Sequence, residues 1–179
     1  MSRFEYIFVL ISIVAGLALT HLLSGLTRSL KSSEQKYDFA HIVFSLATIV
    51  LLFGVWWTTF RWESNEVWTF LEFSLLGLFA SMFYVMAAIL YPSYSPEVPR
   101  FDEVRTRFYV ALALYNLLEM QNVYMRDGFF APFYVPMIIH LIVLAGIGLL
   151  LRNRRFDQLY AAWTLLVNVC WPFLARSMG

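Results

Sequence analysis

Long apolar stretches separated by short polar gaps dominate this sequence. Hydrophobic residues make up 60% of its 179 residues and charged residues only 14%, and the mean hydropathy is +0.66. A stretch of about 20 apolar residues crosses a ~30 Å hydrocarbon core as a helix. We therefore predict an all-α integral membrane protein, a single domain over residues 1–179. The predicted transmembrane helices, six in number, cover residues 6–30, 39–60, 67–91, 105–126, 133–151 and 156–175.

Basic residues concentrate in alternate gaps between these stretches. Short loops rich in Lys and Arg stay in the cytoplasm. We therefore expect the three basic loops inside and both termini on the outer, periplasmic side. The three basic gaps contain Arg28, Lys31 and Lys36; Arg100, Arg105 and Arg107; and Arg152, Arg154 and Arg155, whereas the other gaps and the ends contain Arg3, Arg61, Arg126 and Arg176.

The sequence lacks the motifs of several classes of protein. The first apolar stretch is longer than a typical signal core and shows no clear cleavage site, so we expect a permanent helix. Cys170 is the only cysteine, which excludes an intramolecular disulfide or a thiolate metal cluster. Phosphate-binding, zinc-protease and hydrolase motifs are missing, and the basic residues form no nucleic-acid-binding face. We expect no metal, no cofactor and no nucleic-acid partner, and the sequence supports no enzymatic activity.

The fourth predicted span is the least apolar, because polar residues follow the short run FYVALALYNLLEM. If it lay on the surface, the basic cluster at residues 152–155 would move to the outer side, against the pattern of the other loops. We therefore expect it to cross, which places Glu119 within the membrane. At about 100° per residue, one sector of this helix carries Tyr115, Glu119, Asn122 and Arg126, with Asn116 to one side.

Glu119 and His140 are predicted to lie at similar depth on adjacent antiparallel helices. A carboxylate–imidazole contact there would form a proton-handling pair. Asn168 of the sixth span lies at a comparable level, and Glu72 enters the outer end of the third span. Two interpretations remain open. Glu119 either belongs to a ligand or ion site, or is neutral or paired, for example with Arg126, and only helps to pack the bundle.

The tryptophans are skewed toward the predicted outer side. They form either an aromatic belt at the outer interface or the wall of an outer pocket. With Glu72 and Glu119 nearby, such a pocket would bind an organic cation through cation–π and charge contacts. The tryptophans near the outer ends of their helices are Trp56, Trp57, Trp62, Trp68 and Trp171.

Small residues recur every four positions in the first span, at Ser12, Gly16, Thr20 and Ser24. This spacing lets helices approach closely. The stripe serves either packing within the chain or a seam between copies of it. His21, on the same helix, lies near His41 in depth, which leaves open a separate metal or haem site there.

The opening FEYIFVLISIVAGLALTHLLSGL, together with the paired Trp56 and Trp57, resembles a group of small bacterial multi-pass membrane proteins of uncharacterised function. The resemblance implies a bacterial inner-membrane location. It supplies no activity, substrate or catalytic residue.

Two classes of function follow from these patterns. The favoured one is a transporter or channel-like binding protein, whose outer, Trp-lined cavity contains Glu119 and takes a small cationic or lipid-like ligand. The alternative is a non-catalytic scaffold or accessory subunit of a larger or homo-oligomeric complex, associating through the small residues of the first span. The candidate ligand residues are Glu119, His140, Asn168, Asn116, Glu72, Trp56, Trp57 and Trp171.

Overall fold

The computed structural model describes residues 3–31, 38–65, 67–93, 97–130 and 133–177. This part of the chain contains six α-helices, one short 3-10 helix and no strand. Each predicted span corresponds to one α-helix, so the all-helical class and the six helices are confirmed. The elements are α1 (Arg3–Lys31), α2 (Phe39–Thr58), η1 (Thr59–Ser64), α3 (Phe70–Leu90), α4 (Phe101–Asp127), α5 (Tyr134–Leu151) and α6 (Arg154–Ser177).

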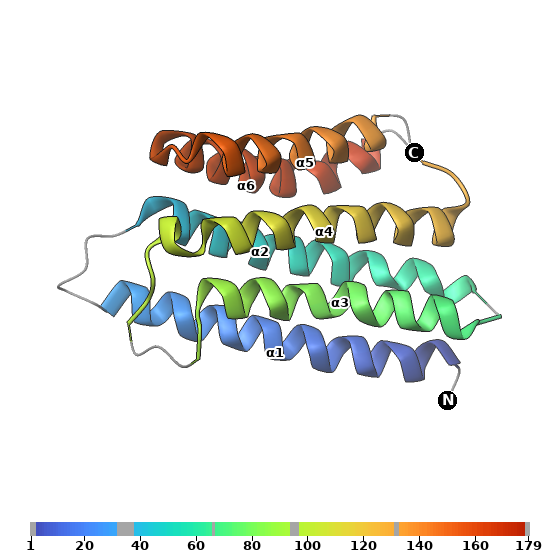
Figure 1. The fold of residues 1–179 in the computed structure, drawn as a ribbon. Coiled ribbons are helices and arrows are strands. Elements are labelled where there is room, and N and C mark those ends of the chain that lie inside the picture. The colour runs from blue at the N-terminus through green and yellow to red at the C-terminus, as the bar shows by residue number, and fades with distance from the viewer. Residues whose placement is uncertain (1–2, 32–37, 66, 94–96, 131–132, 178–179) are drawn as a thin grey trace.

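The helices lie side by side in three layers of two, and consecutive helices run in opposite directions (Figure 1). One outer layer contains α1 and α3, the middle layer α2 and α4, and the other outer layer α5 and α6. Between layers, α3 packs on α4, α4 on α5, and α2 on both α1 and α6. The helices α5 and α6 touch each other much less than they touch the middle layer. The middle layer therefore holds the bundle together.

Four helices are long and apolar enough to cross a membrane. They span Arg3–Leu30, Phe39–Glu63, Phe70–Leu90 and Tyr134–Leu151. Both α4 and α6 are long enough but carry more polar residues. In α4 the buried residues include charged and amide side chains as well as aromatic ones, which lowers its apolar character without exposing those groups.

Side chains and turns mark several helix ends. Thr69 begins α3 with a reciprocal capping box, in which its hydroxyl accepts from the Glu72 N–H and the Glu72 carboxylate accepts from the Thr69 N–H. Asp38 precedes α2, but its carboxylate accepts from the Phe101 N–H at 2.9 Å and so caps α4. Gly128 ends α4 in the left-handed conformation, with φ of 71°, which glycine adopts without steric cost.

Aromatic rings fill the core between the middle and outer layers. The ring of Phe44 on α2 lies 4.9 Å from the rings of both Phe101 and Phe108 on α4, and 5.7 Å from that of Tyr160 on α6. All four rings are nearly inaccessible. Offset and edge-to-face pairs of this kind stabilise by more than their buried area, so this cluster ties three helices together at one end.

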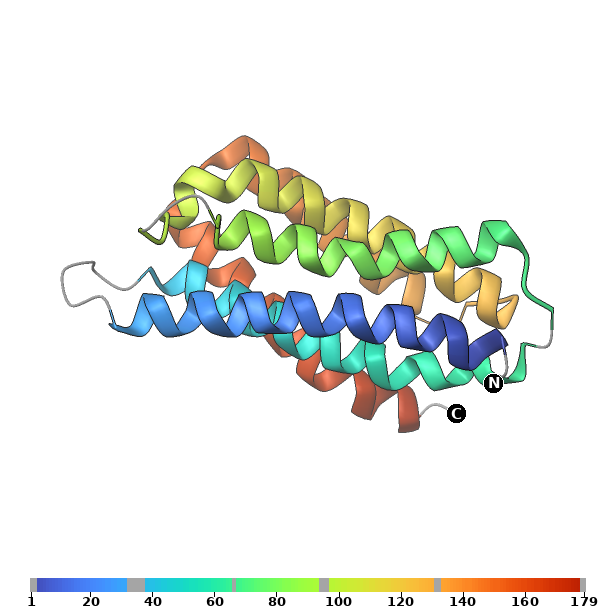
Figure 2. The same ribbon diagram turned by 90° about the horizontal axis from the view of Figure 1, so that it is seen from below.

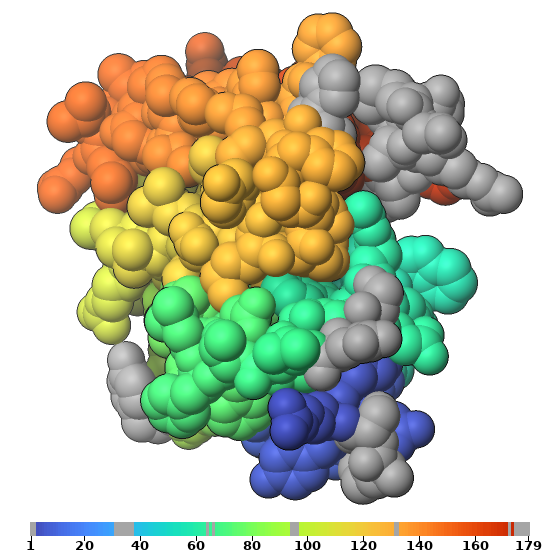
Figure 3. All heavy atoms as spheres, turned by 90° about the vertical axis from the view of Figure 1, so that its right-hand side faces the viewer, coloured from blue at the N-terminus to red at the C-terminus, as the bar shows by residue number. Residues whose placement is uncertain are grey.

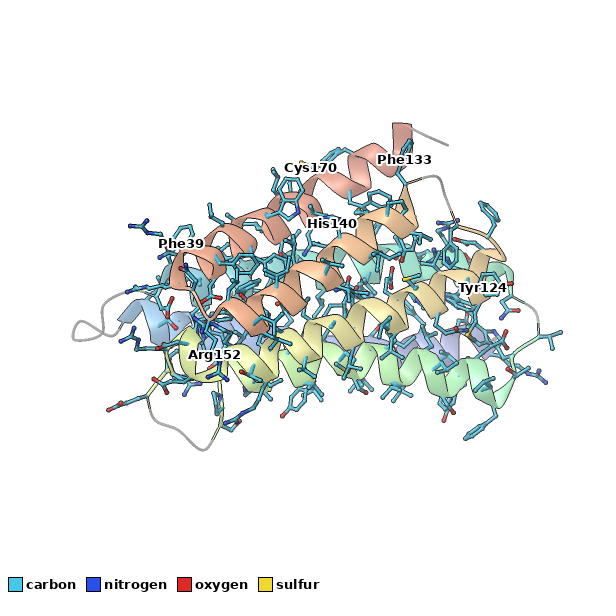
Figure 4. The ribbon with its side chains drawn as sticks, turned by 45° about the horizontal axis from the view of Figure 1, so that its top comes forward. Phe39, Tyr124, Phe133, His140, Arg152 and Cys170 are labelled. Atoms are coloured by element: carbon cyan, nitrogen blue, oxygen red, sulfur yellow. The ribbon has the colours of Figure 1, made fainter. Side chains whose placement is uncertain are left out.

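The two ends of the bundle differ in charge. The first turn of α1 and the last turn of α6 lie at the same end (Figure 1). Figure 4 shows Tyr124 and Phe133 at that end, and Phe39 and Arg152 at the opposite end. The last turns of α1, α3 and α5 and the first turns of α2, α4 and α6 all lie at the end of Arg152, and the described residues of the three basic groups lie in or near these turns. We call the two ends the terminal end and the basic end.

Candidate functional site

Glu119 lies on α4 toward the terminal end and is partly buried. Its nearest polar partners are on α4 and α5: the Arg126 guanidinium, the Tyr134 hydroxyl and the Asn122 amide all interact with the carboxylate. Tyr134 is 5% exposed and begins α5. The carboxylate therefore has a positive charge and polar groups close to it within the chain.

The same cluster continues into an ion-pair network at the terminal end. Asp127, the last residue of α4, accepts from both Nε and Nη2 of Arg126, at 3.0 and 2.9 Å. Its Oδ1 also accepts from the Arg61 Nη2 at 3.0 Å, which links η1 to α4. Together with Glu119 the network contains two cations and two carboxylates, so its formal charges balance.

His140 lies near the middle of α5, and Figure 4 shows it on the side of α5 that faces α6. Its Nε2 accepts a hydrogen bond from the indole Nε1 of Trp163 at 2.8 Å, with the ring centroids 5.9 Å apart. Among the side chains that the structure describes, no hydrogen bond or ion pair joins His140 to Glu119. The two residues predicted to form a pair have different partners.

Both predicted asparagines bond to backbone carbonyls. The Asn168 side-chain amide donates to the Ala47 carbonyl at 3.1 Å and so connects α6 to α2. Asn116 is 3% exposed and donates to the Leu112 carbonyl of its own helix at 2.8 Å. In a membrane interior, polar side chains that bond across helices hold them together. The Asn168 bond therefore holds α6 against α2, whereas the Asn116 amide is satisfied within α4.

The remaining predicted ligand residues are spread over the terminal end. Glu72 serves the capping box of α3. Trp56 and Trp57 are 41% and 76% exposed, and Trp171 packs on Tyr134 with ring centroids 5.8 Å apart. Of these, only Trp171 lies against a partner of Glu119. The structure therefore does not gather the predicted set around one cavity.

The small-residue stripe of α1 lies away from the core. Gly16, Thr20 and Ser24 are exposed and Ser12 is partly exposed. A methyl group added to Gly16 would meet no atom within 4 Å. The buried face of α1 instead consists of larger apolar side chains and alanines: Ile7, Ile11, Ala15, Ala18 and Leu22. Figure 2 shows the outer side of α1 uncovered between α2 and α3.

An open crevice of about 450 Å³ lies between the first turns of α1 and α3. Figure 3 looks onto this end of the bundle, where the start of α1 (blue) lies beside the start of α3 (green). Apolar and aromatic side chains make most of its wall. The lining residues are Arg3, Tyr6, Ile7, Trp68, Thr69, Phe70 and Phe73.

A buried ion pair near the basic end was missed by the sequence reasoning. Arg105 of α4 donates to both carboxylate oxygens of Asp157 on α6, through Nε at 3.1 and 2.9 Å and also through Nη2. The Tyr109 hydroxyl donates to Oδ1 of the same carboxylate at 2.8 Å. The side chains of Arg105 and Asp157 are only 9% and 2% exposed. This bidentate, hydrogen-bonded pair fixes α6 against α4.

Tyr91, near the basic end, makes two polar contacts and one aromatic contact with other helices. Its hydroxyl lies 2.9 Å from the Ser45 hydroxyl, its carbonyl lies 2.6 Å from the His21 Nε2, and its ring packs edge-on against His41 at 4.9 Å. The two histidines left open as a separate site are therefore both in contact with one tyrosine. Gly25 lies directly against the ring.

Comparison with protein-family models, curated proteins and solved structures gave no match to this chain. Function therefore has to be argued from the geometry itself. Within the described residues, Glu119, His140, Asn168 and Asn116 all interact with other groups of the same chain. Two features that lie at the surface are the small residues Gly16, Thr20 and Ser24 of α1 and the crevice between α1 and α3.

Proposed function

We propose that this chain is a bacterial inner-membrane protein that acts by assembly, as a non-catalytic scaffold or accessory subunit whose copies associate through α1. This is the second of the two functions considered from the sequence. It rests on one observation above all. The polar candidates Glu119, His140, Asn168 and Asn116 interact within the chain, whereas Gly16, Thr20 and Ser24 of α1 are exposed.

In this proposal all six helices cross the bilayer, with the basic end in the cytoplasm. The position of α4 in the middle layer supports its crossing (Figure 1), because Arg105, Tyr109 and Asn116 of α4 are buried within the bundle. Ionisable groups within membranes are tolerated where they pair with one another or with polar groups. The pairing of Arg105 with Asp157 gives α6 the same support.

The exposed side of α1 suits close approach by a second copy. Thr20 donates its hydroxyl to the Gly16 carbonyl at 2.8 Å, so it adds no unpaired donor to the surface. Lipid tails are as apolar as leucine, so small residues promote helix association by allowing backbone contact and tight van der Waals packing. Gly16 is exposed in the middle of this face, where a partner backbone would come closest.

Cysteine cross-linking in native membranes tests this function. Cys170 is the only cysteine, so Cys170→Ser gives a background for Gly16→Cys and Thr20→Cys. The matched controls are Gly146→Cys and Val143→Cys on α5, which also has an outward side. We expect oxidation to give cross-linked dimers from the α1 positions only. Equal cross-linking at both helices, or none at α1, contradicts the proposal.

Transport remains a second candidate because Glu119 lies within a predicted span. A proteoliposome flux assay with monovalent cations separates the two functions. Assembly predicts no flux above that of empty liposomes, from either the unaltered protein or Glu119→Gln. Cation flux that is lost in Glu119→Gln, with the variant still folded, favours transport instead.

A further inference from the structure

The crevice between α1 and α3 is lined mainly by apolar and aromatic side chains, which suit an acyl chain. Its volume of about 450 Å³ falls within the ~300–1,000 Å³ of typical ligand pockets. The ring of Trp68 is held in place against the buried Trp62, with centroids 5.1 Å apart. Ile7 forms part of the buried face of α1. Both side chains give the crevice a firmly packed, mainly apolar wall, in which the indole N–H of Trp68 is a buried donor without a hydrogen-bond partner among the described residues.

The outer wall of the crevice leaves apolar surface uncovered. Phe70 is 83% exposed and Tyr6 is 67% exposed, although both line the crevice. Aromatic side chains are enriched at the membrane–water interface, where they lie at the level of the lipid headgroups. The position of the crevice at the end of two apolar helices places these rings at that level if both helices cross the bilayer.

Charged groups of both signs lie at the crevice: the Arg3 guanidinium, and the Glu72 carboxylate that accepts from the lining residue Thr69. Arg3 is the cation among the lining residues. Arg61 and Arg126, at the same end of the bundle, bond to Asp127, and the nearby Glu72 carboxylate is bonded to Thr69 in the capping box. A guanidinium matches a phosphate group well, because it presents several donors in one plane. An anionic group at the mouth of the crevice would therefore find a partner in Arg3.

We propose that this crevice binds one phospholipid molecule, with the phosphate at Arg3 and an acyl chain against Ile7, Trp68, Phe70 and Phe73. The organic cation expected from the sequence is disfavoured here, because the described lining residues include Arg3 and no carboxylate. A second copy of the chain is also a poorer occupant, because none of Ser12, Gly16, Thr20 and Ser24 lines the crevice. The lipid site does not depend on self-association.

Native mass spectrometry tests the proposal on the full chain, purified in mild detergent and supplied with a phosphatidylglycerol carrying two 16- to 18-carbon chains, about the length of one bilayer leaflet. Two pairs of surface variants are compared. Arg3→Gln is matched by Arg107→Gln, an exposed arginine at the basic end, and Phe70→Ala by Phe129→Ala, an exposed phenylalanine elsewhere at the terminal end.

We expect the unaltered protein and both controls to retain one lipid, and Arg3→Gln and Phe70→Ala each to lower the lipid-bound fraction severalfold. Retention unchanged in both test variants overturns the proposal. A loss in Arg3→Gln alone also overturns it, because it indicates a headgroup contact without an acyl chain in the crevice. Inorganic phosphate in place of the lipid should give no retained adduct, and an equal adduct contradicts a lipid site.

A photoreactive phospholipid locates the site. With a diazirine on the acyl chain, cross-links should fall on residues 3–7 and 68–73. Cross-links spread evenly over the outward side chains of α5 and α6 would show only the surrounding lipid and refute the assignment.

Discussion

Gly25→Ala should destabilise the bundle, because the Tyr91 ring occupies the space next to this glycine. A Cβ atom at position 25 would lie 2.0 Å from Cγ of Tyr91 and 2.3 and 2.4 Å from its two Cδ atoms. Carbon atoms that are not bonded prefer separations of ~3.5–4.0 Å. The ring would have to move by about 1.5 Å to restore that separation.

The surroundings of Tyr91 make this movement costly. The side chain is fully buried, its hydroxyl pairs with Ser45, and its ring contacts that of His41. Overpacking of this kind costs ~1–3 kcal/mol, whereas alanine gains up to about 1 kcal/mol over glycine in a helix interior. We expect a net loss of about 1–2 kcal/mol, using those two ranges.

Thermal unfolding followed by tryptophan fluorescence measures the effect. For a chain of this size a loss of 1 kcal/mol lowers Tm by about 2–4 °C, so Gly25→Ala should lower Tm by several degrees. Gly77→Ala, on α3, is the matched control, because its new methyl group meets nothing within 4 Å and should leave Tm unchanged or higher. In a Tyr91→Leu background, Gly25→Ala should cost much less. If the cost is the same with and without the Tyr91 ring, the steric explanation is wrong.

Three further substitutions test other contacts. Asp157→Asn should lower the free energy of unfolding by about 3–5 kcal/mol in a chemical-denaturation assay, because it leaves the buried Arg105 charge uncompensated. The double variant Arg105→Met, Asp157→Leu should recover most of that loss. If stability is not recovered, the ion pair is not buried as described. Trp163→Phe removes the donor to His140 and should cost about 0.6–1.7 kcal/mol in the same assay, and an unchanged stability would argue against that bond. Thr69→Ala should lower stability by ~1 kcal/mol through loss of the α3 cap, whereas Thr69→Ser should retain it.

Helix positions followed from the sequence because the apolar stretches are long and the gaps between them short. Even α4, the least apolar helix, could be predicted, because the basic groups before α4 and after α5 are expected on the same side of the membrane. That requires an even number of crossings between them, so α4 must cross if α5 does. The structure begins α4 at Phe101, four residues before the predicted start at Arg105. The helix begins there because the carboxylate of Asp38, the residue before α2, accepts from the N–H of Phe101.

The partners of individual polar residues could not be predicted. Depth along a helix follows from the rise per residue, but the rotation of one helix against its neighbour depends on how many side chains pack together. Rotation decides that Glu119 meets Tyr134 at the start of α5, while His140 meets Trp163 of α6. The candidate residues thus lie on the predicted helices, but the structure does not bring them together in one cluster as predicted.

The Arg105–Asp157 pair was missed because both residues lie at the edges of predicted spans. Arg105 was counted only as a loop cation for the topology. Asp157 belongs to none of the patterns that the sequence analysis used. A lone aspartate one turn inside an apolar helix, level with an arginine on another, is a signal that could have identified the pair.

Cysteine labelling from the two sides of the membrane tests most directly whether α4 crosses the bilayer in the proposed orientation. In the Cys170→Ser background, Ser93→Cys and Phe129→Cys place thiols at exposed positions before and after α4. With a membrane-impermeant maleimide, we predict that Phe129→Cys reacts in cells whose inner membrane is intact, and that Ser93→Cys reacts only after that membrane is permeabilised. Labelling of both positions from the same side would contradict a membrane-spanning α4 and the six-helix topology built on it.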